Sequence, residues 1–236
     1  MVKKPKKKRR IRIGYTKKRY TKSKIESLMK SQLYVNDYQL VMMAYGLALL
    51  MHWHVFRGDM AKYFEHCKSV ALIIILEFKV FLVNPIVVAF LHDIMEDVNK
   101  KSDNKKDSPT ITWWTIQRMF GKTIYRGLRI ISKEDEKDYY LGIENVQPRD
   151  WWIILVKLAD RLHNIRNILH MSKKFMLRQL RETEMLYPHL LEVFEDKIPR
   201  RFKYLPDYIR GELEFACNKI RKKLGMPKSS AFKRVK

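Results

Sequence analysis

The run VALIIILEF at residues 70–78 constrains the fold most, because it is apolar nearly all round a helix. Such a helix is stable only inside a protein core. Further apolar segments follow at 84–98 and 151–169, and no segment has the pattern of a strand. With only 8 Gly and 8 Pro in 236 residues, the composition also suits a helix-rich protein. The sequence therefore predicts one all-α domain.

Capping and turn residues divide the chain into about eight to ten helices. Asn36 and Thr110 or Thr112 are candidate caps, Pro85 suits a first helical turn, and Gly121 separates two helices. The predicted helices span 36–56, 61–78, 85–98, 112–120, 122–132, 133–146, 151–169, 173–187, 188–197 and 205–224. We expect a flexible arm (1–35), a domain (36–200), a C-terminal helix packed on it (201–224) and a basic tail (225–236).

The net charge of +24 is concentrated in the two tails. Residues 1–24 hold thirteen Lys or Arg and no acid, and residues 215–236 hold eight and no acid, which leaves +3 for the body. Blocks of like charge stay solvated and can bind phosphates. The tails therefore suggest contact with RNA, DNA or a ribosome, with a role in solubility as the alternative.

The segment 38–56 carries no formal charge and approaches the length of a membrane span. It contains Gln39, His52 and His54, so we predict a buried amphipathic helix and no membrane association. Whether it packs internally or against a second copy is left open. We expect no signal peptide, and Cys67 and Cys217 lack a CxxC spacing. A cytoplasmic location with reduced thiols is the prediction.

The segment HDIMED at 92–97 is the strongest chemical signal. On a helix, His92 and Glu96 share one face, and Asp93 and Asp97 lie one step round. Acids and histidines on an apolar helix are costly unless they are paired or bind a metal. The segment therefore favours a functional site over a chance HD pair on an exposed face.

Two other segments add weaker signals. In VKLADRLHNIRN, Asp160 and Asn164 form an i,i+4 pair, although from that segment alone a helix surface with several charge pairs is the favoured explanation. In KYFEHCKSVA, His66 lies on the polar edge of the apolar helix. Alone, such a histidine is more often a surface or satisfied core residue.

Taken together, these segments resemble the hydrolase domain of the RelA/SpoT family, a branch of the HD superfamily. The matching motifs are YFEH at 63–66, HDIMED at 92–97 and KLADRLHN at 157–164, in the family's order and at about its spacing. Two further segments are weakly similar to the family: WWTIQRMFG at 113–121 resembles its helix ending in FG, and RETEMLYPHL at 181–190 resembles its RET…Y segment. The similarity covers roughly residues 40–190.

The resemblance implies an HD-domain helical bundle with one Mn²⁺ per chain. The implied metal ligands are His66, His92, Asp93 and Asp160. Glu96 and Asp97 match the family's catalytic acid pair, and the implied substrate-binding residues are Arg57, Tyr63 and Asn164.

The implied reaction removes pyrophosphate from the 3′ position of the alarmone ppGpp or pppGpp. A bound divalent ion lowers the pKa of its bound water and so supplies hydroxide near neutral pH. The resemblance implies that this metal-bound water attacks the 3′-pyrophosphate. Because 236 residues leave no room for the synthetase and regulatory domains of the long family members, we expect a stand-alone small alarmone hydrolase.

Three departures from the family pattern bear on substrate preference. Cys67 stands where the family usually has Pro, and Gly58 stands where it usually has a basic residue. Asn167 stands where the family often has Thr. Alternatives therefore stay open: another HD phosphohydrolase, such as a nucleotidase or an NADPH 2′-phosphatase, or a nucleic-acid- or ribosome-associated protein that senses a nucleotide. A structural domain with chance motifs is the simplest alternative.

Overall fold

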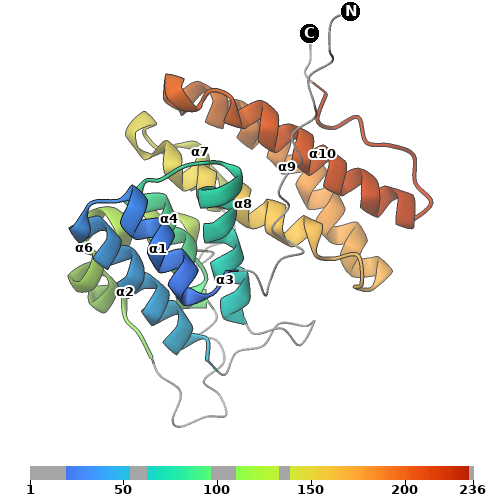
Figure 1. Ribbon diagram of the computed structural model, residues 1–236. Coiled ribbons are helices and arrows are strands. Elements are labelled where there is room, and N and C mark those ends of the chain that lie inside the picture. Colours follow the sequence, from blue (N-terminus) through green and yellow to red (C-terminus); the bar gives the residue numbers. More distant parts are fainter. Residues whose placement is uncertain (1–19, 54–62, 97–109, 133–138, 234–236) are drawn as a thin grey trace, which may run out of the picture.

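The fold was analysed in a computed structural model, which describes residues 20–53, 63–96, 110–132 and 139–233. In these ranges every regular element is helical, so the predicted all-α class is confirmed (Figure 1). The longer helices are α1 (Lys22–Gln32), α2 (Val35–Met51), α3 (Tyr63–Leu72), α4 (Val83–Leu91), α6 (Trp113–Ile131), α7 (Tyr139–Glu144), α8 (Trp151–Arg166), α9 (Lys173–Lys197) and α10 (Leu205–Lys223). A π-helical turn at Ile73–Glu77 continues α3, and short 3₁₀ turns lie at Pro148–Asp150 and Arg200–Phe202.

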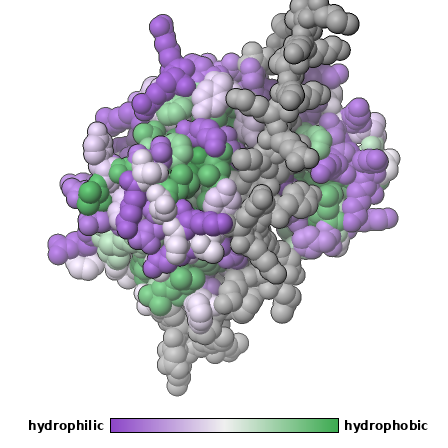
Figure 2. All heavy atoms as spheres, viewed as in Figure 1, coloured by the Kyte–Doolittle hydropathy of each residue, from purple (hydrophilic) through white to green (hydrophobic). Residues whose placement is uncertain are grey.

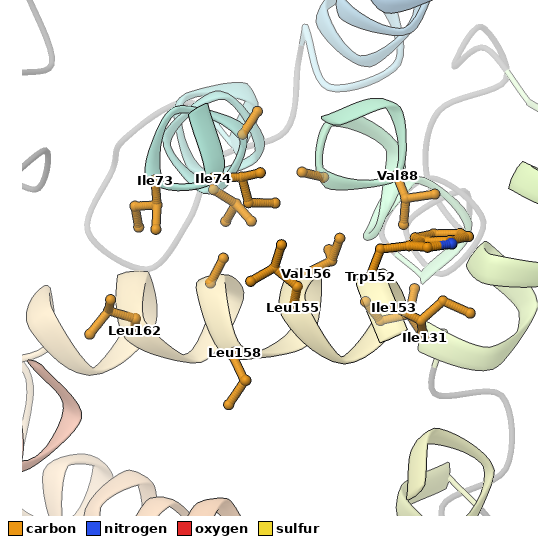
Figure 3. Packing of buried hydrophobic residues seen from close by; sticks show 14 of the residues in the cluster. Ile73, Ile74, Val88, Ile131, Trp152, Ile153, Leu155, Val156, Leu158 and Leu162 are labelled. Carbon is orange, nitrogen blue, oxygen red and sulfur yellow. The ribbon is translucent and has the colours of Figure 1, made fainter. Parts of the chain in front are cut away.

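Helix α8 is the centre of the fold. All of its residues are buried except Asn164 and Arg166. It packs against α3 and α4 on one side and against α9 and α10 on the other. Figure 3 shows Ile73 and Ile74 pointing toward α8, with Val88 of α4 beside Trp152. Packing on both sides fixes the position of every polar group that α8 carries.

The other helices form two groups around α8 (Figure 1). On one side, α2 packs along α4 and α1 packs on α2. The residues 85–91 of α4 are all buried, as expected for a helix that is apolar all round. On the other side, α9 and α10 lie against each other and against α8.

The predicted flexible arm is wrong for residues 22–32, which form α1. The side-chain oxygen of Thr21 accepts a hydrogen bond from the Lys24 backbone N–H at 3.4 Å and caps the helix. Ile25 and Met29, one turn apart, are fully buried and attach α1 to the core despite its basic flank. Residues 1–19 lie outside the described part of the chain. The predicted cap at Asn36 is also wrong, because α2 begins at Val35.

Helix α9 runs unbroken through Pro188, where two helices were predicted. Pro188 removes only one backbone donor. Thr183, Tyr187, Leu190 and Leu191 are buried on both sides of it and hold the two halves in line. By contrast, the predicted break at Gly121 is confirmed, since this residue has φ 80° inside α6. Thr112 caps α6 through a hydrogen bond from the Thr115 N–H at 3.1 Å.

The C-terminal segment packs back on the domain as far as residue 233. The Ser229 N–H donates to the Asn218 side-chain oxygen at 2.8 Å, and the Phe232 ring is 2% exposed. The predicted basic tail from residue 225 is therefore not fully solvated, because the Phe232 ring is buried.

The surface mixes hydrophobic patches with hydrophilic side chains (Figure 2). The stripe of α2 that faces away from the core includes Val35, Met43 and Leu50, which are exposed. The opposite stripe, including Tyr45 and Ala48, is buried, so α2 is only half covered. Among the described residues no helix combines the length and the apolar character that crossing a membrane requires.

A buried ion network fixes the C-terminal end of α8. Arg166 donates to Glu77 at 2.9 and 3.0 Å and to Glu212 of α10 at 2.7 Å. The Tyr208 hydroxyl also donates to Glu77, at 3.2 Å. The Glu77 and Glu212 side chains are 0% and 1% exposed. Arg166 therefore joins the π-helical turn, α8 and α10.

We predict that Arg166→Met lowers the free energy of unfolding by about 3–5 kcal/mol, because it leaves two buried carboxylates without their cation. Urea unfolding checks this. Arg118→Met is the control: Arg118 is exposed and stacks on the exposed Trp114 ring, so its loss should cost less than about 0.5 kcal/mol. Equal losses in the two variants would contradict the network's importance.

Candidate metal centre

Four side chains from three segments converge beside α8. His66 comes from α3, His92 and Asp93 follow α4, and Asp160 lies on α8. The Nε2 atom of His66 lies 3.1 Å from Nε2 of His92, 3.3 Å from Oδ2 of Asp93 and 3.2 Å from Oδ1 of Asp160. The Nε2 atom of His92 lies 3.2 Å from Asp93 Oδ2 and 3.7 Å from Asp160 Oδ1. The structure thus brings together the four residues predicted as metal ligands.

His92 and Asp93 follow directly on the last residue of α4. Helix α4 ends at Leu91, His92 and Asp93 form a turn, and residues 94–96 are helical again. The predicted helix over 85–98 is thus interrupted at two residues, although His92 keeps helical dihedral angles (φ −58°, ψ −32°), and residues 97–98 lie outside the described part of the chain. Neighbouring side chains on a helix point about 100° apart. The ends of the His92 and Asp93 side chains nevertheless meet, with Nε2 of His92 3.2 Å from Oδ2 of Asp93.

The donor set fits a divalent cation. Two ligand atoms about 2.1 Å from an ion and at right angles are about 3.0 Å apart, close to the spacing here. Two imidazole nitrogens and two carboxylate oxygens suit a borderline or hard ion. His66, His92 and Asp160 are all buried, with donor atoms within 4.8 Å of one another. Buried carboxylates that face imidazoles so closely are typical of a metal centre.

Surrounding groups hold three of the four side chains in place. The Nδ1 atom of His92 lies 2.9 Å from the Ala89 carbonyl oxygen, which accepts its proton and leaves Nε2 free to bind a metal. The Tyr63 hydroxyl donates to Asp93 Oδ2 at 2.9 Å. Asn164 donates to Asp160 Oδ1 at 2.7 Å. Tyr63 and Asn164, predicted to bind substrate, thus contact the carboxylates, and their substrate role stays a prediction.

Charges in the cluster compensate one another. Burial disfavours the His92 imidazolium, but the carboxylates of Asp93 and Asp160 outweigh burial and hold the pKa of His92 well above its usual value. Burial would raise the pKa of Asp93, yet His92 and His66 hold it well below its usual range. Burial opposes ionisation of Asp160 too, but Lys157 and then the two histidines keep its pKa well below normal. Both carboxylates are therefore ionised and ready to bind a cation.

The cluster lines a polar pocket of about 190 Å³. Glu96 lines the pocket beside His92 and Asp93. Residues of α8 and α9 also line the pocket: Arg161 donates to Gln179 at 2.7 Å and is paired with Glu182. Arg57 and Asp97, the other predicted site residues, lie outside the described residues.

Three residues near the centre were missed by sequence reasoning. Lys157 is buried and donates to Asp160 Oδ2 at 3.3 Å. His163 lies against His66, and His52 is fully buried and stacks on the Tyr63 ring at 5.3 Å. Lys157 and His163 sit three residues before and after Asp160, so their helical spacing was an available signal. For His52 the sequence offers no comparable signal.

Cys67, noted above as a departure from the family pattern, is buried next to this centre. Its thiol, a His92 nitrogen and an Asp93 carboxylate oxygen lie within 4.8 Å of one another. The Cys217 thiol is buried as well, and burial raises its pKa to about 12.

The described part of the chain thus gathers two histidines and two aspartates from three segments of an all-α domain. No family model matches the chain. The chain is similar to the bifunctional (p)ppGpp synthase/hydrolase SpoT of Escherichia coli K12, with 24% identity over 216 residues. It is 27% identical over 220 residues to the GTP pyrophosphokinase rsh of Brucella ovis. The predicted resemblance to the RelA/SpoT family is therefore confirmed.

The alignments cover most of this chain and a minor part of the relatives. They include 81% and 86% of the chain but only 29% of SpoT and 27% of the Brucella protein. A solved structure described as a metazoan ortholog of SpoT that hydrolyses ppGpp shares 16% identity, with a TM-score of 0.49. That match covers 80% of this chain and 97% of the other.

We predict that Mn²⁺ stabilises the protein through this cluster. At a free ion concentration of about 100 times Kd, binding contributes about 2.7 kcal/mol, or about 5–10 °C in Tm. Asp160→Asn should remove most of this shift, because it keeps the side-chain shape but removes the charge. Thermal unfolding with Mn²⁺ and with a chelator measures the shift in each variant.

Asp196→Asn is the matched control, since Asp196 is exposed on α9. It should keep the full Mn²⁺-dependent shift. The same shift in Asp160→Asn as in wild type would exclude Asp160 as a ligand.

Proposed function

We propose that the chain is a metal-dependent hydrolase that converts ppGpp or pppGpp to GDP or GTP and pyrophosphate. The convergence of His66, His92, Asp93 and Asp160, with the acid Glu96 in the same pocket, carries the proposal. Relatives of the chain include SpoT and a guanosine-3′,5′-bis(diphosphate) 3′-pyrophosphohydrolase of Escherichia coli O157:H7, at 24% identity. The cluster lies in the part of the chain that is similar to these enzymes, which supports the same chemistry here.

The four ligand residues would hold one divalent ion, and we propose Mn²⁺. When bound, such an ion lowers the pKa of a coordinated water and polarises a phosphoryl oxygen. The chain contributes the geometry for this chemistry. Ala89 and Tyr63 fix His92 and Asp93, and Lys157 balances the charge of Asp160. A rigid donor set of this kind needs little reorganisation during the reaction.

Glu96 is the group in the pocket that we assign as general base. Its carboxylate would take a proton from the attacking water, and Asp97, next in the chain, would position it. Glu96 is only partly buried, so its proton can pass on to solvent. Arg57 would bind a substrate phosphate as a planar fork, and Asn164 and Tyr63 would border the nucleotide.

We further propose that the basic tails bring the enzyme to RNA, DNA or a ribosome inside the cytoplasm. The thirteen Lys and Arg of residues 1–24 support this, because phosphate contacts release counterions. Binding would weaken steeply as salt increases.

We predict that Glu96→Gln lowers kcat for ppGpp by about 10²–10⁴-fold and leaves Mn²⁺ affinity unchanged, because a general base is lost while the ligands remain. Ion-exchange chromatography of the products measures turnover, and calorimetric titration measures affinity. Glu192→Gln, at an exposed residue of α9, is the control and should behave as wild type.

The products separate this proposal from other phosphohydrolases. Release of GDP and pyrophosphate from ppGpp supports it. Inorganic phosphate from NADPH or a nucleoside monophosphate, with ppGpp left intact, would assign a different HD activity. Loss of Mn²⁺ binding in Glu96→Gln would make Glu96 a ligand and contradict its role as base.

A further inference from the structure

The motif KLADRLHN contains a histidine, His163, to which neither the family resemblance nor the proposed mechanism assigns a role. His163 is 5% exposed, and its Nδ1 atom lies 2.8 Å from Nδ1 of His66. The two rings are tilted by 56°, with centroids 4.7 Å apart. Because one nitrogen of such a pair must donate and the other accept, the contact selects a proton position on both rings.

The proton position on His66 follows from the geometry of the cluster. The Nε2 atom of His66 faces His92, Asp93 and Asp160. An imidazole nitrogen that binds a metal must present its lone pair, so the proton of neutral His66 has to sit on Nδ1. Nδ1 then donates to Nδ1 of His163, whose own proton must sit on Nε2.

We propose that His163 is a positioning residue for the metal centre: it accepts the Nδ1 proton of His66 and thereby holds Nε2 ready to bind the ion. This inference rests on the metal centre of the proposed function. His92 is held differently, by the Ala89 carbonyl one turn away on its own helix. His66 depends instead on a side chain of another helix, α8.

One helix therefore controls two of the four ligands. Asp160 is itself a ligand on α8, and His163, one turn further along, orients a second ligand on α3. A shift of α8 relative to α3 would disturb both at once. The apolar contacts of Ile73 and Ile74 with α8 (Figure 3) keep the two helices in register.

The test compares two substitutions of opposite character. His163→Asn places an amide oxygen near the position of Nδ1 and can still accept the proton of His66. His163→Leu fills the buried space with an apolar side chain but accepts nothing. Loss of a group that orients a metal ligand typically weakens metal affinity 10- to 100-fold. We expect about this loss for His163→Leu and less than about 5-fold for His163→Asn.

Calorimetric titration of the metal-stripped full chain with Mn²⁺ measures these affinities. Thermal unfolding in chelator reports folding separately from metal binding. His170→Leu is the matched control, because His170 is exposed between α8 and α9, and it should bind Mn²⁺ as wild type does.

The two possible roles of His163 predict opposite rankings. If His163 orients His66, the Asn variant binds Mn²⁺ more tightly than the Leu variant, whichever of them is more stable without metal. If it only fills space, Leu equals or exceeds Asn, and the inference is wrong. Wild type that binds no Mn²⁺ would overturn the metal centre as well. Wild type that binds and hydrolyses ppGpp, with His163→Leu binding equally well, would overturn only the role of His163.

Discussion

Two buried imidazoles, the buried Asp160 carboxylate and the partly buried Asp93 carboxylate meet at one point, and the packing of the surrounding helices has to accommodate them. Removing each charged carboxylate from water costs several kcal/mol, which only close partners can offset. The cluster meets this cost by facing Asp93 and Asp160 toward His66 and His92 at 3.2–3.7 Å. A divalent cation would offset it further. The apolar helices α3, α4 and α8 pack against one another and so keep the four groups together.

The burial of α8 explains how such a site can be rigid. Both ends of this helix are fixed by ion pairs: Arg126 contacts Asp150 at 2.6 Å just before its first residue, and Arg166 joins Glu77 and Glu212 at its last turn. Between these ends, Lys157, Asp160 and His163 follow one another at three-residue intervals. Helix α8 thus supplies the ligand Asp160 and the ammonium group of Lys157 beside it. It also supplies His163, which accepts the proton of the second ligand, His66.

Much of this arrangement could be predicted from sequence, and the failures have physical causes. HDIMED and KLADRLHN indicated a site because polar groups interrupt segments that are otherwise apolar. The contact between His66 and His163 could not be predicted in the same way, because it joins two helices that are far apart in the sequence. A helix break was predicted at Pro188, but α9 is continuous there because the buried side chains of Tyr187 and Leu191 hold its two halves in line. Helix α1 was not predicted, because the many basic residues before it suggested a solvated arm. The i,i+4 spacing of the apolar Ile25 and Met29 was the signal for a helix.

We propose that His66, His92, Asp93 and Asp160 jointly bind one metal ion. A crystal of the full chain grown with Mn²⁺, with anomalous diffraction recorded at the manganese edge, tests it most directly. We expect one strong anomalous peak in contact with all four side chains. A peak on the Cys67 side of His92 without contact to Asp160, or no peak at the cluster, would contradict it.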